Sequence, residues 1–249
     1  MNAWQRFWSA EPDPSTLRRF RIALGLLLLA YYSFLLPSWR LYFGPGLWWG
    51  VYGVSLVAGA ALAAGWGGRL PIAWLWLANL LLMHRNPAVI NGEERLLAIL
   101  LGFSLFLPFG RASKRAWTGA FRLIQIHLLA IYAISMLWRL TLDRSWWSGD
   151  AVYLAMNSML FPRWPGLPLF AWHGAVVSRA LTYATAALEI LFPILVWRRS
   201  LRTPLTLAMM GLHACLAVML EGLMLFNLTM MVGLILFLDL RPEAHERAG

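Results

Sequence analysis

The chain has 249 residues, of which 60% are hydrophobic and 13% are charged, and its formal net charge is +10. A soluble domain carries about 25% charged residues, so this composition excludes a protein that covers its core with a polar surface. It favours a membrane protein in which the excess of Lys and Arg reflects orientation in the bilayer, and we expect no nucleic-acid partner.

Apolar segments follow one another along the whole chain. Several approach the roughly 20 residues that cross a bilayer as a helix, so we predict an all-α, polytopic transmembrane bundle with about eight spans. They are residues 21–39, 51–66, 70–83, 96–109, 119–138, 178–197, 203–220 and 223–240. The third and fourth are short and could instead form one re-entrant hairpin.

The segments outside these spans complete the predicted organisation. Trp4, Phe7 and Trp8 share one face of a short helix, so residues 1–20 are predicted to be an interfacial segment. Residues 21–240 then form one transmembrane domain, and residues 241–249 form a polar tail. Between the fifth and sixth spans, a long outer-face segment contains a short or re-entrant helix near residues 151–160.

The basic residues predict the orientation of the chain. With eight spans, 14 of the 21 Lys and Arg residues fall on the side of the two termini and seven on the other. Because Lys and Arg accumulate in cytoplasmic loops, we expect a multi-pass protein of the inner (plasma) membrane of a bacterium, with both termini in the cytoplasm.

The fifth span carries a polar stripe. Gln125, Tyr132 and Arg139 recur at intervals of seven residues, which places them in one narrow sector of a helix. A membrane helix turns such a stripe toward other helices or a wet cavity. Just beyond Arg139, Trp146 and Gly149 belong to a tight turn. We therefore predict that this stripe lines a substrate-binding site that opens at a membrane face.

Two ionisable residues lie deep in later spans. Glu189 is halfway along the sixth span and His213 is halfway along the seventh. A charged group at this depth costs a few kcal/mol on insertion scales unless it has a partner or a wet cavity. Adjacent antiparallel helices would place both at similar depth, so we predict a hydrogen bond between them. It would serve either as a proton-handling pair or as a contact that holds the helices together.

The loop after the third span is the other polar candidate. Arg85, Asn86 and Asn91 would form the mouth of the site, although solvated loop charges explain this composition equally well. The five His and one Cys show no HxxxH, HExxH or CxxC spacing, so no metal site is predicted. We expect His127, on another face of the fifth span, to be a lone interfacial or packing residue and not a metal ligand.

Several segments taken in order resemble the HTTM family, the horizontally transferred transmembrane domain related to the vitamin K-dependent gamma-carboxylase. The first half contributes FWSAEPDPSTLRRFRIALG, the Gly-Pro-Gly turn, RNPAVINGEERLL and LFLPFG. The second half contributes QIHLLAIYAISMLWRL, WWSGDAVYLAM, ALEILFPIL and LFNLTMMVGLILFL. The resemblance extends from about residue 7 to residue 238.

This resemblance implies a helical bundle that binds a reduced quinone such as vitamin K hydroquinone. In the animal carboxylase a Lys acts as the base on the hydroquinone, and Arg139 stands at the matching place here. A guanidinium stays protonated, so Arg139 would bind an anion, and Glu189 or His213 would handle protons. The cofactor, the substrate and any carboxylase-like or redox activity follow from the resemblance alone.

Three functions remain open at this stage. The first is an enzyme that acts on a lipid-soluble, quinol-like or peptide substrate in an outer-facing cavity within the membrane. The second is a non-enzymatic helper for the maturation, export or immunity of a peptide or partner protein. The third, weaker reading is a transporter for an anionic solute, although the chain shows no internal repeat.

Overall fold

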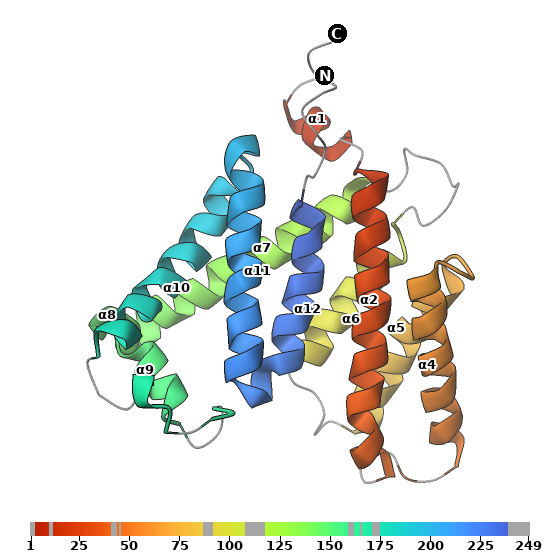
Figure 1. The fold of residues 1–249 in the computed structure, drawn as a ribbon. Helices are drawn as coiled ribbons and strands as arrows, with labels where there is room; N and C mark the ends of the chain where they lie inside the picture. The colour runs from red at the N-terminus through yellow and green to blue at the C-terminus, as the bar shows by residue number, and fades with distance from the viewer. Residues whose placement is uncertain are drawn as a thin grey trace.

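The computed structural model describes residues 3–9, 12–40, 44, 46–86, 92–107, 118–158, 162–164, 166–170 and 175–238. Within these ranges the regular structure is helical, and one isolated β-bridge joins Pro162 to Leu220 (Figure 1). The predicted all-α class is therefore confirmed for the described part of the chain.

Each of the eight predicted segments corresponds to a helix. They are α2 (Pro14–Leu35), α4 (Leu47–Ala64), α5 (Leu70–Arg85), α6 (Gly92–Ser104), α7 (Thr118–Leu142), α10 (Val176–Leu195), α11 (Arg199–Met219) and α12 (Met224–Leu234), which continues as η5 (Ile235–Phe237). Shorter elements lie between them: α1 (Ala3–Ser9), η1 (Leu36–Ser38), α8 (Ser145–Ser148), α9 (Ala151–Met156), η3 (Pro168–Phe170) and η4 (Glu221–Leu223). The helix predicted near residues 151–160 is α9, which has six residues.

Four of the described helices are long and apolar enough to cross a membrane. They are Pro14–Ser38, Leu47–Ala64, Gly119–Leu142 and Arg199–Met219. Helices α5 and α6 have 16 and 13 residues, and at 1.5 Å per residue they reach about 24 and 20 Å, less than the roughly 30 Å hydrocarbon core. The fold is thus that of a helical membrane protein, and the number of crossings stays a prediction.

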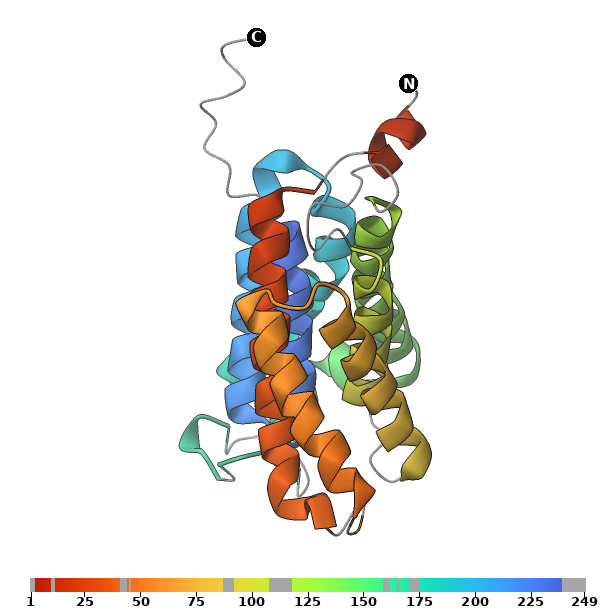
Figure 2. The same ribbon diagram turned by 90° about the vertical axis from the view of Figure 1, so that its right-hand side faces the viewer.

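Successive long helices run in alternating directions. Figure 1 shows the start of α2 and the end of α12 at the same end of the bundle, with α4 and α5 on one side and α8 to α10 on the other. Helix α7 passes obliquely behind α11 and α12 and contacts α6, α10 and α12. Figure 2 shows α2 and α4 side by side, as their contacts require.

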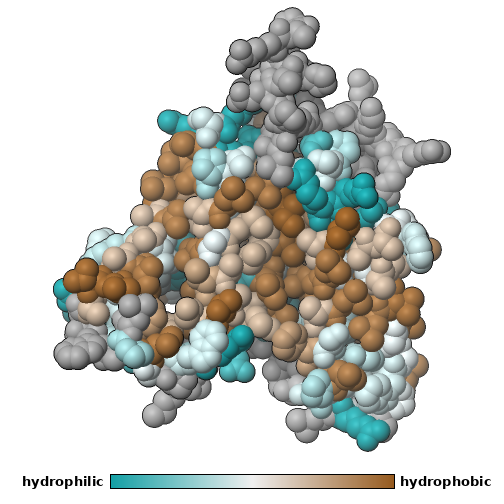
Figure 3. All heavy atoms as spheres, viewed as in Figure 1, coloured by the Kyte–Doolittle hydropathy of each residue, from teal (hydrophilic) through white to brown (hydrophobic). Residues whose placement is uncertain are grey.

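The surface is apolar around the middle of the bundle. In Figure 3 hydrophobic residues cover the centre of the visible face, and hydrophilic residues lie toward its upper and lower edges. Large apolar side chains such as Val57, Leu137 and Ile194 are more than 60% exposed. In water such a surface would drive aggregation, whereas acyl chains cover it at no cost.

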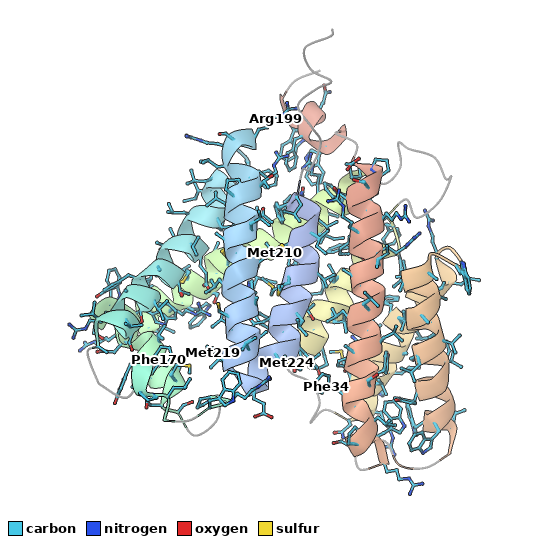
Figure 4. All side chains as sticks on the ribbon, viewed as in Figure 1. Phe34, Phe170, Arg199, Met210, Met219 and Met224 are labelled. Atoms are coloured by element: carbon cyan, nitrogen blue, oxygen red, sulfur yellow. The ribbon has the colours of Figure 1, made fainter. Side chains whose placement is uncertain are left out.

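Two apolar clusters form the interior. The main one joins α2, α4 to α7 and α10 to α12 around large buried side chains, including Trp39, Tyr32 and Phe192. A smaller cluster joins Met156 of α9, Phe170 of η3 and Leu220, the residue after α11. Phe170 and Met219 of this region are labelled in Figure 4.

Candidate functional site

Five polar side chains from four helices meet within the apolar interior. Tyr132 and Arg139 come from α7, Glu189 from α10, His213 from α11 and Asn227 from α12. The least exposed four are Tyr132, Glu189, His213 and Asn227, each at most 5% exposed. We call these five residues the buried polar cluster. In Figure 4 His213 belongs to the stretch of α11 between the labelled Met210 and Met219.

The local sequence explains why these side chains face inward. On α7 the seven-residue spacing places Gln125 and Tyr132 on one buried face, as the stripe predicts. On α10 the buried positions Ser178, Thr182 and Glu189 share a face. On α11, Thr206 and His213 repeat the spacing of seven. The predicted inward direction of these polar faces is confirmed.

Both ring nitrogens of His213 have a hydrogen-bond partner. Its Nε2 lies 2.7 Å from the hydroxyl of Tyr132, and its Nδ1 lies 2.7 Å from Oδ1 of Asn227. The amide nitrogen of Asn227 donates to the carbonyl of Leu223, so its oxygen faces the imidazole and can only accept. Nδ1 of His213 therefore donates, and in the neutral ring Nε2 accepts from the Tyr132 hydroxyl.

Arg139 and Glu189 form an ion pair near the end of α7. Nη1 of Arg139 donates to Oε2 of Glu189 at 2.6 Å. The guanidinium also lies 4.8 Å from the ring centroid of Trp146, within cation–π distance. The Arg139 side chain is 36% exposed, whereas that of Glu189 is 7% exposed. The guanidinium of this pair is thus partly exposed, whereas the carboxylate is buried.

The predicted hydrogen bond between Glu189 and His213 is wrong. Both residues are buried as expected, but each bonds to a side chain of α7, Glu189 to Arg139 and His213 to Tyr132. A guanidinium offers a buried carboxylate charge-assisted hydrogen bonds that neutral histidine cannot offer. Asn227 occupies the other ring nitrogen of His213. Glu189 and His213 are therefore each bonded to the polar face of α7 and not to one another.

The turn after Arg139 is shaped as the sequence predicts. Gly149 has φ +82° and ends α8, and a Cβ there would lie 3.0 Å from Cγ of Arg179 and 3.1 Å from the hydroxyl of Tyr183. That hydroxyl donates to the carbonyl of Trp147 at 2.9 Å, which fixes α8 against α10. Glycine is needed for both the backbone conformation and the space. The turn places the Trp146 ring beside Arg139.

Other predicted site residues lie apart from this cluster. Gln125 donates to the carbonyl of Leu236 and accepts from Arg122, so it joins α7 to η5. Arg85 lies at the end of α5, 6.0 Å from the ring of Trp48, and Asn86 follows it. Figure 1 places α5 and α8 on opposite sides of the bundle. Arg85 and Asn86 therefore form no mouth beside Trp146, and Asn91 lies outside the described residues.

Asn227, which accepts from Nδ1 of His213, is a site residue that was not predicted from the sequence. The available signal was an amide in the middle of the apolar run LFNLTMM, where an unpaired polar group would be costly. His127, which we expected to be a packing residue, is half-buried with its ring centroid 6.5 Å from that of Phe103. In the described part of the chain, no three His, Cys, Asp or Glu side chains are grouped so as to hold a metal ion.

Comparison of the chain with protein-family models, with curated proteins and with solved structures finds no match. The resemblance to the HTTM family therefore stays a prediction.

Proposed function

We propose that this protein is a multi-pass membrane enzyme of the HTTM and gamma-carboxylase-like kind, which removes a proton from a lipid-soluble, quinol-like or peptide substrate. One observation carries the proposal: the buried His213 is held at Nδ1 by Asn227 and lies with Nε2 2.7 Å from the Tyr132 hydroxyl, so its neutral form has an acceptor nitrogen beside a phenol. Such a pair can pass a proton from a third hydroxyl or amide to the imidazole.

The cluster contains the parts that this transfer needs. A substrate hydroxyl that donates to the oxygen of Tyr132 would lose its proton as Tyr132 passes its own to Nε2 of His213. Asn227 accepts from Nδ1 and would stabilise the resulting imidazolium. Arg139, exposed at one end of the cluster, is the group that would attract the substrate anion. A reduced quinone is the cofactor or substrate that the family resemblance implies.

The same proposal includes the topology. Eight helices of alternating direction, with both ends of the bundle domain on the side richer in Lys and Arg, support an inner-membrane protein with cytoplasmic termini. The short α5 and α6 would then cross as a pair where the bilayer thins locally, or enter it without crossing.

A second function is favoured by a different observation. The carboxylate of Glu189 and both ring nitrogens of His213 already have partners within the chain. In that state the cluster holds four helices together and has no need of a substrate. The protein would then be a non-enzymatic helper for the maturation, export or immunity of a peptide or partner protein.

Retention of a quinone by the purified protein separates these functions. We expect mass spectrometry to detect a bound isoprenoid quinone in the wild type and about tenfold less after Tyr132→Phe, since this change removes the hydroxyl oxygen that would accept a hydrogen bond from the quinol. Thr206→Ala is the matched control, because Thr206 is buried on the same face of α11 and bonds only the carbonyl of Arg202. Absence of any quinone, together with a stoichiometric second protein, would reject the enzyme in favour of the helper.

A further inference from the structure

A cavity lies at the end of the bundle where α2 ends and α12 begins. Its volume is about 510 Å³, within the roughly 300–1,000 Å³ that is common for small-molecule sites. Six of its lining residues carry the argument: Phe34, Glu93, Arg163, Glu221, Met224 and Leu225. We call it the mixed-charge cavity, because carboxylates and a guanidinium share it with apolar side chains. None of its residues belongs to the buried polar cluster.

The charged groups of this cavity come from separate elements. Glu93 is in the first turn of α6, Glu221 is in η4, and Arg163 follows the bridge between Pro162 and Leu220. Both ion pairs found in the described part of the chain join other residues, so Arg163 lies more than 4 Å from either carboxylate. The opposite charges thus face one cavity without closing it, which leaves room between them for a ligand that carries both signs.

Hydrogen bonds hold Arg163 against the start of α12. Its backbone amide donates to the carbonyl of Met219 at 2.9 Å, and its Nη2 lies 3.4 Å from Sδ of Met224. A thioether is a weak acceptor, so the guanidinium keeps most of its donors for water or a ligand. Its planar fork matches a phosphate or a carboxylate, which can accept two parallel hydrogen bonds. Arg163 is therefore suited to the anionic part of a ligand.

The two carboxylates are suited to a primary ammonium group. Burial, and then the charge of Glu94, raises the pKa of Glu93 to about 7, and a cation beside Glu93 would favour its ionised form. Glu221 is exposed. A primary ammonium group offers only donors, so it can bond both carboxylates at once. A quaternary ammonium group has no N–H and cannot make these bonds.

The apolar wall belongs to a helix that is long enough to cross the bilayer. Phe34 is 57% exposed in the last turn of α2, within the candidate span Pro14–Ser38. Figure 4 shows Phe34 and Met224 at the same end of the neighbouring helices α2 and α12, away from the start of α2. The end of a spanning helix lies at the level of the lipid headgroups, so the cavity meets headgroups and the first carbons of acyl chains.

We propose that the mixed-charge cavity binds the headgroup of an aminophospholipid, a lipid that carries a phosphate and a primary ammonium group. Arg163 binds the phosphate, Glu93 and Glu221 bind the ammonium group, and the start of an acyl chain lies against Phe34 and Leu225. Each charged side chain thereby gains a partner of opposite sign. The apolar wall at the end of a spanning helix favours a lipid over a free zwitterion such as an amino acid.

Native mass spectrometry of the full chain at pH 8, where Glu93 is largely ionised, compares lipids that share their acyl chains. We expect phosphatidylethanolamine to bind about tenfold more tightly than phosphatidylcholine, which has no N–H, or phosphatidylglycerol, which has no cation. R163Q should bind phosphatidylethanolamine about tenfold more weakly, as expected for the loss of a charge-assisted hydrogen bond. R144Q is the matched control, since Arg144 is an exposed arginine of the same segment between α7 and α10, outside the cavity, and its loss should change binding less than about threefold.

E221Q tests the ammonium end separately. Because Glu221 is exposed, this variant should keep the thermal midpoint of the wild type in detergent and lose about threefold of the preference for phosphatidylethanolamine over phosphatidylglycerol. If R163Q fails to fold, the result for E221Q decides, and an unchanged preference would overturn the proposal. So would equal binding of the three lipids or an equal effect of R163Q and R144Q. Displacement of the lipid by millimolar glycerophosphoethanolamine would assign the cavity to a soluble zwitterion instead.

Discussion

The two halves of the bundle hold their helices together by different means. Between α2 and α4 the contact is made by small residues: Gly25 faces Ala63 so closely that an added Cβ would lie 2.5 Å from the Ala63 nitrogen, and Gly59 faces Leu29. Between α7, α10, α11 and α12 the buried polar cluster adds hydrogen bonds and an ion pair to the apolar contacts. In lipid the hydrophobic effect does not drive helices together. Close packing and interhelical hydrogen bonds stabilise their contacts instead.

The difference suggests where function lies. The glycine and alanine positions between α2 and α4 carry no group that can bind or transfer a proton, and the tyrosines beside them, Tyr32 and Tyr52, pack edge to face. The cluster contains a cation, a carboxylate, an imidazole, a phenol and an amide. Such groups are costly in a membrane when closer packing would hold the helices as well. This contrast directs a search for activity to the second half.

The largest expected effect tests the small-residue contact. Gly25→Ala places a methyl group against backbone atoms of α4, which cannot move aside as a side chain can. We expect a loss of about 3 kcal/mol in the free energy of unfolding, at the upper end of the range for overpacked interiors. Denaturant titration of the protein in detergent, followed by Trp fluorescence, measures this loss.

Gly53→Ala is the matched control for that experiment. Gly53 lies in the middle of α4, and a Cβ there would meet nothing within 4 Å. Alanine should leave stability unchanged or raise it by up to about 1 kcal/mol, because it favours the helix more than glycine does. If both variants lost the same stability, the close contact between α2 and α4 would not be the reason.

The second prediction concerns the unequal exposure of the ion pair. Arg139→Met leaves the carboxylate of Glu189 buried without its cation, and we expect a loss of about 2 kcal/mol. Glu189→Gln should cost about 1 kcal/mol, because the Arg139 side chain is 36% exposed and its charge can turn to water. The double variant Arg139→Met, Glu189→Gln should lose less than the sum of the two. Equal losses for the single variants would show that burial does not set this balance.

The helical framework was largely readable from the sequence, because apolar length and Gly or Pro breaks determine where helices start and end. Long, apolar helices such as α2, α7 and α11 follow directly from this signal. The stripe of Gln125 and Tyr132 was readable too, because the helical period fixes which residues share a face. Neither signal reports which helices become neighbours.

The partners of the deep polar residues could not be read for that reason. Glu189 and His213 lie on consecutive helices, and sequence order suggested that they bond to one another. In the structure α7 contacts α10, and its long Arg139 side chain reaches Glu189. Asn227 reaches His213 because α12 packs closely on α11. Which polar side chains bond to one another depends on which helices are neighbours in space, and no local pattern of a single sequence encodes this.

The smallest expected effect compares a carboxylate of each half of the bundle. The one in the first half, Glu93, has no cation within 4 Å among the described residues. Glu93 stands at the start of α6, outside the four helices that are long and apolar enough to cross a membrane, beside a cavity of about 510 Å³ that Arg163 also lines. Burial, and then the charge of Glu94, raises the pKa of Glu93 to about 7. Glu189, by contrast, has its arginine at 2.6 Å.

A raised pKa means that the folded protein binds this proton more tightly than the unfolded chain does. Between the ordinary glutamate pKa of 4.5 and about 7, the free energy of unfolding should therefore fall as the pH rises, and above this window the contribution of Glu93 should be constant. Because the side chain is partly exposed, solvent screening limits the fall to about 1 kcal/mol. Denaturant titrations of the wild type and Glu93→Gln at pH 5 and pH 8 measure this fall.

Glutamine removes the titrating group, so the variant should lose this part of the pH dependence and no other. An unchanged slope in Glu93→Gln would assign the pH dependence to another group and leave the first half of the bundle without an unpaired carboxylate that matters to its stability.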